Sequence, residues 1–312
     1  MESLIIATNA VVPFMVYIAV GIIARRAGWV KETFLRELNS VLFKVFFPFI
    51  MFNNLYKVDF STLRGAGYVL FAFAGTLVVI LLSFFTVPLF EKDNRRIPVI
   101  MQVFYRSNAV LFAIPLSASV LGDAASLKAS IIVAFLVPLY NVSAVFILEY
   151  FRGNSVSFKS IIIGVLKTPL IVGAIAGALF NVLPFTMPDA LAAPISQLSA
   201  LATPMALFVL GGTLRISDVR KNAPVLFVGT LSKLVILPAV MVSLMVIMNF
   251  EPSELFAVFC LWATPVAAAS FPMAQSMGAD SDLAGEYVVV TTLTSIITIF
   301  VWILILKNTG LI

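Results

Sequence analysis

The residues most able to bind a ligand or take part in chemistry are cations that lie inside long apolar segments. Arg106 and Lys233 stand deep inside such segments, and Lys44 stands near the end of a third, where its long side chain can reach the polar boundary. Charge in apolar surroundings is costly, so it usually marks a binding site, a pathway or an ion pair. No Asp or Glu occupies the middle of any of these segments. The partner expected for a central cation is therefore an anion that comes and goes, although a pair between Arg106 and Glu286, or contacts with main-chain carbonyls, would also satisfy it.

The chemistry open to this chain is narrowed by its shortage of metal-binding and nucleophilic residues. It contains no histidine and a single cysteine, Cys260, which excludes internal disulfides, thiolate zinc sites, haem ligation by histidine and histidine-based triads. No GxxxxGK[ST] motif for ATP phosphates occurs. The middles of the apolar segments also lack an acid and base pair for catalysis. We therefore expect a protein that is not an enzyme and that holds no metal and no organic cofactor.

The composition is that of a chain solvated by lipid. Hydrophobic residues make up 61% of the sequence and charged residues 11%, and the mean hydropathy is +1.09. A globule of 312 residues cannot be covered with so little polar surface, so the lipid bilayer is an expected partner. The net charge of +5 comes from basic residues in short connections, which indicates membrane orientation and not a nucleic-acid partner. Glu2 precedes an apolar run long enough to span, which we interpret as a retained first helix.

Ten apolar segments, separated by charged residues or by Gly and Pro clusters, are each about long enough to cross a bilayer as a helix. They cover residues 3–24, 38–56, 66–90, 98–121, 127–149, 162–183, 190–212, 223–249, 254–278 and 285–306. The sequence therefore predicts an all-α integral membrane protein with ten transmembrane helices. The short connections leave no room for a soluble domain.

The second half of the sequence repeats features of the first at a shift of about half its length. Three pairs of residues lie 156 or 157 positions apart: Asn108 with Pro265, Pro115 with Pro272, and Pro48 with Pro204. Each copy holds five segments, and because five is odd the second copy enters the membrane from the opposite side. We therefore predict two inverted five-helix repeats, residues 1–150 and 159–312, in which helices four and nine are broken and cross each other.

The distribution of basic residues predicts the orientation in the membrane. The connections after odd-numbered segments contain thirteen Lys and Arg residues, whereas the opposite side contains Lys57, Arg64, Lys128 and Lys307. By the positive-inside rule the richer side is cytoplasmic, which places both termini on the extracytoplasmic side. We expect a multi-pass protein of the plasma membrane, which in a bacterium is the inner membrane.

The predicted binding site lies where the two broken helices meet. A break near mid-depth frees N–H and C=O groups that hydrocarbon cannot satisfy, so it must face protein, water or a ligand. The N-terminal ends of the half-helices carry partial positive charge, which suits a carboxylate. The alternative is that each proline only kinks its helix, as a single proline would. Small residues at 267–270 would let the two backbones cross closely. The candidate substrate-binding residues are Arg106, Ser107, Asn108, Pro115, Tyr140, Asn141, Lys233, Thr264, Pro265, Ser270, Pro272 and Gln275.

Three stretches carry a resemblance to a known family. They are FFPFIMFNNLYKVDF, YRSNAVLFAIPLSASVLGD, and TPVAAASFPMAQSMGAD followed by TTLTSIIT, and the match extends over nearly the whole chain. In these stretches the sequence resembles the auxin efflux carrier family, within a larger group that includes bile acid and sodium symporters. The long cytoplasmic loop of many plant members is absent, so the chain is similar to the compact bacterial forms.

The resemblance implies ten helices in two inverted five-helix repeats. It implies a scaffold part made of helices one, two, six and seven, through which two copies form a homodimer, and a transport part made of helices three to five and eight to ten. It also implies crossed broken helices at 108–115 and 265–272, with a small organic anion bound beside them. Auxin itself, malate, malonate and other carboxylate metabolites are equally admissible as the substrate.

We expect a secondary transporter that moves a small organic anion, a mono- or dicarboxylate or an auxin-like acid, by alternating access at the helix crossover. The motion is elevator-like or rocking, and a gradient drives it, since the sequence contains no ATP motif. One alternative is a sodium-coupled symporter, with cation ligands from main-chain carbonyls, hydroxyls, Asn and Gln at the breaks. Another is an anion channel, which would use the central cations but need no repeated broken helices. The sequence leaves the coupling ion, H⁺ or Na⁺, open.

Overall fold

The computed structural model describes residues 2–57, 67–153, 163, 166–183, 187–213 and 220–312. Within these residues every regular element is a helix, and the only extended pairing is an isolated antiparallel bridge between Ser107 and Val266. Helices are expected here because hydrocarbon offers no partners to the backbone, which must satisfy its own hydrogen bonds. The prediction of an all-α protein is confirmed.

The helices run as follows along the chain. In the first half they are α1 (Glu2–Arg26), α2 (Glu32–Val41), the π-helix η1 (Leu42–Phe46), α3 (Phe47–Tyr56), α4 (Gly67–Phe90), α5 (Ile97–Tyr105), α6 (Ala109–Leu121) and α7 (Asp123–Arg152). In the second half they are α9 (Pro169–Val182), α10 (Asp189–Thr213), α12 (Ala223–Leu231), the π-helix η3 (Ser232–Ile236), α13 (Leu237–Ile247), α14 (Pro252–Ala263), α15 (Ser270–Met277) and α16 (Ser281–Asn308). Proline stands in the first two positions of α5, α9, α12 and α14, where the N–H group that it lacks is not needed.

Six stretches of helix in the described residues are long and apolar enough to cross a membrane. They are Glu32–Tyr56, Gly67–Phe90, Ala125–Arg152, Asp189–Thr213, Ala223–Ile247 and Ser281–Asn308. The structure therefore has the helices of a multi-pass membrane protein. The fourth and ninth predicted segments are each divided between two shorter helices, α5 with α6 and α14 with α15. The count of ten spans stays a prediction.

The two helix breaks are displaced from the residues that the sequence indicates. The first break covers residues 106–108 and the second covers residues 264–269. The sequence places them at 108–115 and 265–272. In both spans the displacement is toward the N-terminus, and it leaves the second proline of each pair inside a helix.

The position of these prolines within their helices accounts for the displacement. Pro272 is the third residue of α15, in the first turn, where the N–H groups have no partner within the helix. Pro115 lies in the interior of α6, and the helix continues past it to Leu121. Proline removes one hydrogen bond from a helix, and such a loss is tolerated in membrane helices when neighbouring groups compensate.

One group of helices is held together by close backbone contacts at glycine. Gly173 and Gly177 of α9 lie against the main chain of Pro48 and Phe52 of α3, and a Cβ atom added to either glycine would lie 2.3 to 2.4 Å from a carbonyl oxygen. Real Cβ atoms do not approach that closely, so only glycine permits this contact. Gly211 of α10 meets α1 in the same way. The group comprises α1, α2, α3, α9 and α10, which contact one another.

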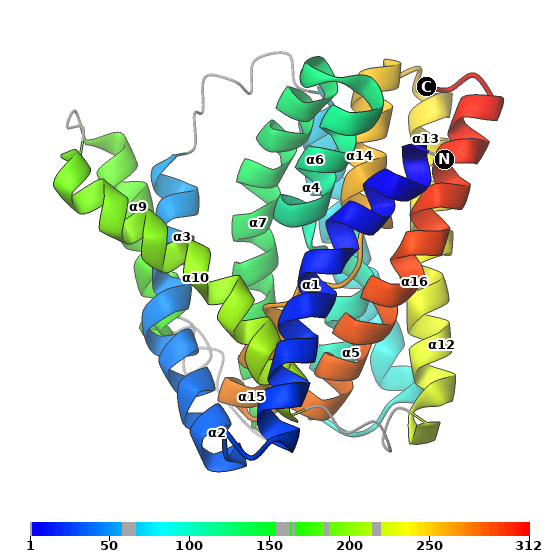
Figure 1. Ribbon diagram of the computed structural model, residues 1–312. Helices are drawn as coiled ribbons and strands as arrows, with labels where there is room; N and C mark the ends of the chain where they lie inside the picture. The colour runs from blue at the N-terminus through cyan, green and yellow to red at the C-terminus, as the bar shows by residue number, and fades with distance from the viewer. Residues whose placement is uncertain (1, 58–66, 154–162, 164–165, 184–186, 214–219) are drawn as a thin grey trace.

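The remaining helices surround the two breaks. Figure 1 shows α2, α3 and α9 on one side of the molecule and α12, α13 and α16 on the other, with α1, α4 to α7 and α14 between them. Both chain termini lie at the same end in this view. The most deeply buried helix of the second group is α14, in which residues 255–263 are all buried. The breaks therefore lie in the interior, away from surrounding lipid.

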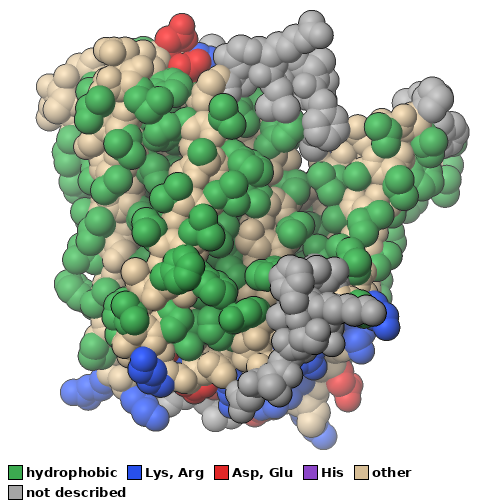
Figure 2. Space-filling model, turned by 180° about the vertical axis from the view of Figure 1, so that it is seen from behind, with side chains coloured by type: hydrophobic (Ala, Val, Ile, Leu, Met, Phe, Trp, Pro, Cys, Tyr) green, Lys and Arg blue, Asp and Glu red, His purple; other side chains and the backbone are tan. Residues whose placement is uncertain are grey.

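The outer surface has the pattern expected of a protein in a bilayer. Figure 2 shows hydrophobic side chains over the middle of the molecule, whereas Lys and Arg side chains gather at its lower end. Exposed leucines and phenylalanines such as Leu70, Phe85 and Phe227 would be unfavourable in water but are favourable against lipid tails. This surface is consistent with an apolar band crossed by helices.

Candidate functional site

The two helix breaks touch each other in the interior of the molecule. The backbone N–H of Asn108 donates to the carbonyl oxygen of Pro265 at 2.8 Å, and Ser107 is bridged to Val266. The N–H of Val266 donates to Oγ1 of Thr291 in α16 at 3.1 Å. Backbone groups released by the breaks therefore find partners within the crossover, as buried main chain requires.

Arg106 is held at the first break by neutral groups. Its side chain is 2% exposed. Its guanidinium donates to Oε1 of Gln102 at 2.7 Å, to Oδ1 of Asn141 at 2.6 Å and to Sδ of Met273 at 3.0 Å. These three partners orient the planar guanidinium but do not neutralise its charge. The ion pairs found in the described residues do not include Arg106.

A cavity of about 600 Å³ lies between the crossover and the helices α1, α3 and α10. The crossover side contributes Arg106, Ser107, Asn108, Pro115, Tyr140 and Asn141 of the predicted site, together with residues 267–269. Ala109 and Val110, the first residues of α6, also line the cavity. Residues 267–269 directly precede α15. The positive ends of two helices therefore point toward one cavity, beside a buried guanidinium.

Lys233 lies behind the crossover and not in the cavity wall. It is fully buried in η3, and its Nζ donates a hydrogen bond to Oγ of Ser107. The same nitrogen lies 5.8 Å from the centre of the Trp262 ring. Because Ser107 lines the cavity, one hydroxyl group connects the amine of Lys233 to the space where a ligand would lie.

The remaining predicted residues also lie outside the cavity wall. Thr264, Pro265, Ser270, Pro272 and Gln275 are not among the described residues that line the cavity. Thr264 instead donates to the carbonyl of Leu261, and the carbonyl of Pro272 accepts from Asn39 of α2. Of the break at 264–269, only the alanines at 267–269 line the cavity.

Several cavity residues have no counterpart in the predicted site. They come from α1, α3 and α10 and are Tyr17, Asn54, Ser199 and Thr203. The sequence holds a signal for two of them. Pro48 and Pro204 are a repeated pair, and Asn54 lies shortly after the first while Thr203 directly precedes the second. Because they line the same cavity as the crossover residues, a ligand with more than one polar end could contact both sets.

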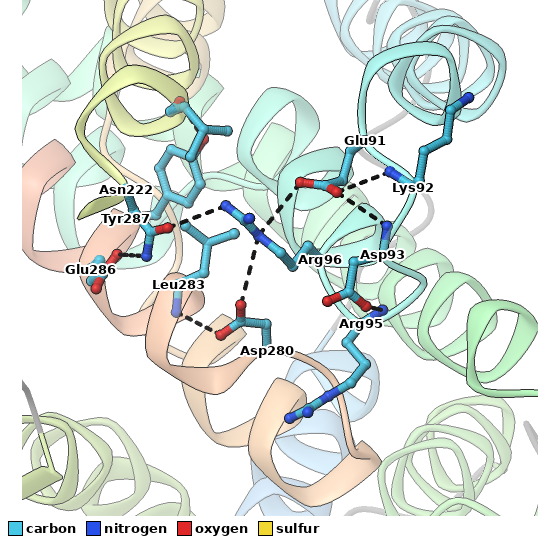
Figure 3. A network of polar contacts seen from close by, with 11 residues as sticks. Glu91, Lys92, Asp93, Arg95, Arg96, Asn222, Asp280, Leu283, Glu286 and Tyr287 are labelled. Carbon is cyan, nitrogen blue, oxygen red and sulfur yellow. Dashed lines mark hydrogen bonds and ion pairs between the residues drawn. The ribbon is translucent and has the colours of Figure 1, made fainter. Parts of the chain in front are cut away.

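A second polar network lies at the basic end of the molecule, away from the cavity (Figure 3). Nε of Arg96 lies 3.4 Å from Glu91 and 3.8 Å from Asp280, and its Nη2 donates to Asn222 at 3.2 Å. Asn222 donates in turn to Glu286 at 2.8 Å. These contacts tie together the start of α5, the start of α12 and the start of α16. They hold these helix starts together at this end of the molecule.

The described residues offer little to a metal ion, since they contain no cluster of three or more Cys, Asp or Glu side chains with suitable spacing. The oxygen and nitrogen atoms around the cavity belong instead to Arg, Asn, Ser, Thr and Tyr. Such a lining can orient an anion by hydrogen bonds, while the guanidinium supplies opposite charge.

Comparison with known proteins agrees with these features. Residues 153–303 match a family model described as "Membrane transport protein". A protein of Rhizobium meliloti (strain 1021) with the name "Putative malonate transporter" is 24% identical over 299 residues, which cover 94% of this chain and 93% of that protein. Both descriptions concern transport and not catalysis. The resemblance seen in the sequence motifs is confirmed.

Proposed function

We propose that this chain belongs to the membrane transport protein family that includes the auxin efflux carriers, and that it is a secondary transporter of small organic anions. The anion binds in the cavity beside the crossed helix breaks, and alternating access exposes that cavity to each side of the membrane in turn. Its substrates are carboxylates. Transport is driven by a gradient.

The observation that carries this proposal is the charge of the cavity wall. Arg106 is buried with three neutral partners, and the first turns of α6 and α15 lie around the same space. Helix N-termini and a guanidinium both favour negative charge. A carboxylate also matches the planar fork of arginine, which an inorganic halide does not.

A short dicarboxylate fits this wall better than a monocarboxylate. One carboxylate would lie against Arg106, Ser107 and Asn108, and the opposite wall offers Ser199 and Thr203 of α10 to a second polar end. The name of the Rhizobium meliloti relative supports malonate as the first compound to test. Malate and auxin-like acids belong to the same class and are the next compounds.

The contact at the crossover supports two inverted repeats, 1–150 and 159–312. Asn108 and Pro265 are equivalent positions 157 residues apart, and they are joined by a hydrogen bond. Such a contact is expected if a two-fold axis relates the copies, because equivalent residues near that axis lie close together. In this architecture α1, α2, α3, α9 and α10 form the scaffold part through which two chains dimerise, and the other helices form the transport part.

The basic end of the molecule supports an orientation with both termini extracytoplasmic in a plasma membrane. Single cysteines at Lys92 and Asn308, which are exposed at opposite ends, test it. An impermeant thiol reagent should label Asn308→Cys in intact cells and Lys92→Cys only after permeabilisation. Cys260 is buried and gives a low background. Labelling of Lys92→Cys from outside would reverse the orientation.

Counterflow in vesicles tests the transport function. Vesicles that hold wild-type protein and unlabelled malonate should accumulate external labelled malonate, and vesicles with Arg106→Gln should not. Arg36→Gln is the matched control, because Arg36 is exposed on α2 and pairs only with Glu32 among described ion pairs. Equal counterflow in both variants would contradict the proposal.

The same vesicles separate the proposal from its alternatives. A carrier shows saturable exchange, whereas an anion channel lets malonate equilibrate without accumulation of label. A sodium-coupled symporter would require sodium on the side from which malonate enters. Accumulation that is unchanged when potassium replaces sodium supports coupling to another ion.

A further inference from the structure

Lys233 carries a fully buried amine that does not line the cavity, so it has no role in contacting the substrate directly. Its Nζ donates to Oγ of Ser107, and Ser107 lines the cavity on its other side. The ring of Trp262 covers the amine at 5.8 Å. The amine is therefore close enough to respond to charge in the cavity, yet it is separated from the cavity by one hydroxyl.

The groups around Lys233 supply no fixed negative charge in the described part of the chain. The main elements packed against η3, besides α12 and α13, are α5, α14 and α16. Their titratable and charged side chains, together with that of the residue directly after α5, are Tyr105, Arg106, Glu254, Cys260, Asp282, Glu286, Tyr287 and Lys307.

The carboxylates in this set lie near the starts of their helices and have other contacts. Glu254 lies 3.6 Å from Lys128. Glu286 accepts from Asn222, which stands eleven residues before Lys233 and so roughly 16 Å away along the helix. Asp282 is in the first turn of α16. No ion pair of Lys233 occurs among the described residues.

The charge on Arg106 makes a second positive charge here unfavourable. Arg106 precedes Ser107 in the chain, keeps its charge in proteins, and lies with Lys233 in an interior shielded from water. A buried ammonium without a counter-ion is costly, and a like charge adds to that cost. An anion in the cavity reverses the balance, because it neutralises Arg106 and attracts a proton to the neighbouring amine.

We propose that Lys233 is a proton-binding site whose occupancy is linked to the anion in the cavity. The amine is neutral while the cavity is empty, and its lone pair takes up one proton from solvent when an anion binds beside Ser107 and Arg106. The proton leaves with the anion on the other side. Lys233 donates to Ser107 in both states, since a neutral amine also carries N–H groups. This inference rests on the proposed transport of organic anions and identifies its coupling ion as a proton.

Titration calorimetry with malonate on the purified full-length protein tests this linkage. Binding is measured in two buffers that differ in their own ionisation enthalpy, over a pH range in which malonate stays a dianion. Proton uptake appears as a difference in the binding heat between the buffers. We expect an uptake approaching one proton, and an affinity that falls by up to about tenfold for each unit rise in pH.

Two substitutions assign that proton to one residue. Lys233→Met keeps the apolar stem and removes the basic group, so proton uptake and the pH dependence should disappear. Lys44→Met is the matched control, because Lys44 also lies in a π-helix but is exposed, and it should keep both. Lys233→Arg places a permanent charge at this position, so its affinity for malonate should not depend on pH. It replaces Lys233→Met in the test if that variant does not fold.

The outcomes separate this inference from the proposed function. Malonate binding to the wild type without proton uptake overturns the proton site and leaves anion transport standing. Uptake that persists in Lys233→Met or Lys233→Arg assigns the proton elsewhere and also overturns it. Absence of binding by any carboxylate overturns both the proposed function and the proton site.

Discussion

The glycine contact between α3 and α9 and the crossover of the two breaks show two opposite ways to bring backbones together. At Gly173 and Gly177 two intact helices touch because side chains are missing. At 106–108 and 264–269 the helices stop, and main-chain hydrogen bonds and buried polar side chains make the contact.

This difference separates a contact that resists change from one that permits it. The glycine contact depends on shape alone, and any movement of α9 along α3 would bring a larger residue against a carbonyl. The crossover depends on hydrogen bonds and charge, which a ligand can replace or compensate at low cost. A fixed support and a responsive site can therefore exist in one apolar chain.

The largest effect is expected from breaking the shape-based contact. Gly173→Ala and Gly177→Ala together place Cβ atoms 2.3 to 2.4 Å from main-chain oxygens. Each should destabilise the fold by about 1–3 kcal/mol, because α9 must move away from α3. Thermal unfolding and the folded yield measure the effect. Gly67→Ala is the control, since its nearest contact would be an ordinary 3.9 Å. Equal melting temperatures for the double variant and the control would contradict the role assigned to glycine.

The next effect comes from adding a carboxylate to the crossover. Asn141 Oδ1 lies 2.6 Å from Arg106, so Asn141→Asp creates a fixed partner for the guanidinium. Pairing should raise the melting temperature, while affinity for malonate should fall by about ten- to a hundredfold, since a charged hydrogen bond contributes about 1.5–3 kcal/mol. Asn141→Leu is the comparison, because it removes the amide without adding charge. An Asn141→Asp protein that binds as tightly as the wild type would show that the anion does not contact Arg106.

A smaller effect distinguishes the two prolines that the sequence treats as equivalent. Pro115→Ala restores an N–H inside α6 and should straighten the helix beside the cavity, which lowers malonate counterflow several-fold. Pro272→Ala changes the first turn of α15 and should leave counterflow nearly unchanged. Folded yield is measured in parallel. Equal losses of counterflow in the two variants would restore the sequence-based view that both prolines define the breaks.

The smallest effect concerns a charge in water, in contrast to the buried charges at the crossover. A hydrogen bond from Lys128 lowers the pKa of Glu251, which caps the start of α14. Because the pKa is lower in the folded state, the contribution to stability is present above the unfolded pKa and is lost as pH falls through the folded pKa. Glu251→Gln should therefore melt slightly below the wild type at neutral pH, and the difference should vanish in acid. A difference that persists at low pH would indicate a role independent of charge.

The sequence was sufficient for the features that depend on local composition. Apolar runs of sufficient length predict helices, because a backbone in lipid must form all its hydrogen bonds within itself. Arg106 is recognisable because charge is rare within such runs, and the repeat alone pairs Asn108 with Pro265, which a hydrogen bond joins in the structure. The breaks were located only to within a few residues, since proline is compatible with both a first turn and a helix interior.

The membership of the cavity wall was decided by tertiary structure. Asn54, Ser199 and Thr203 enter it because α3 and α10 pack opposite the crossover, and no local pattern records that distance. Lys233 was expected among the ligands but lies behind Ser107, because the rotation of its helix and the turn of the chain at 106–108 point it away from the cavity. Sequence periodicity determines which residues share a face of one helix. Which faces meet, and what space remains between them, depends on how all the helices pack together.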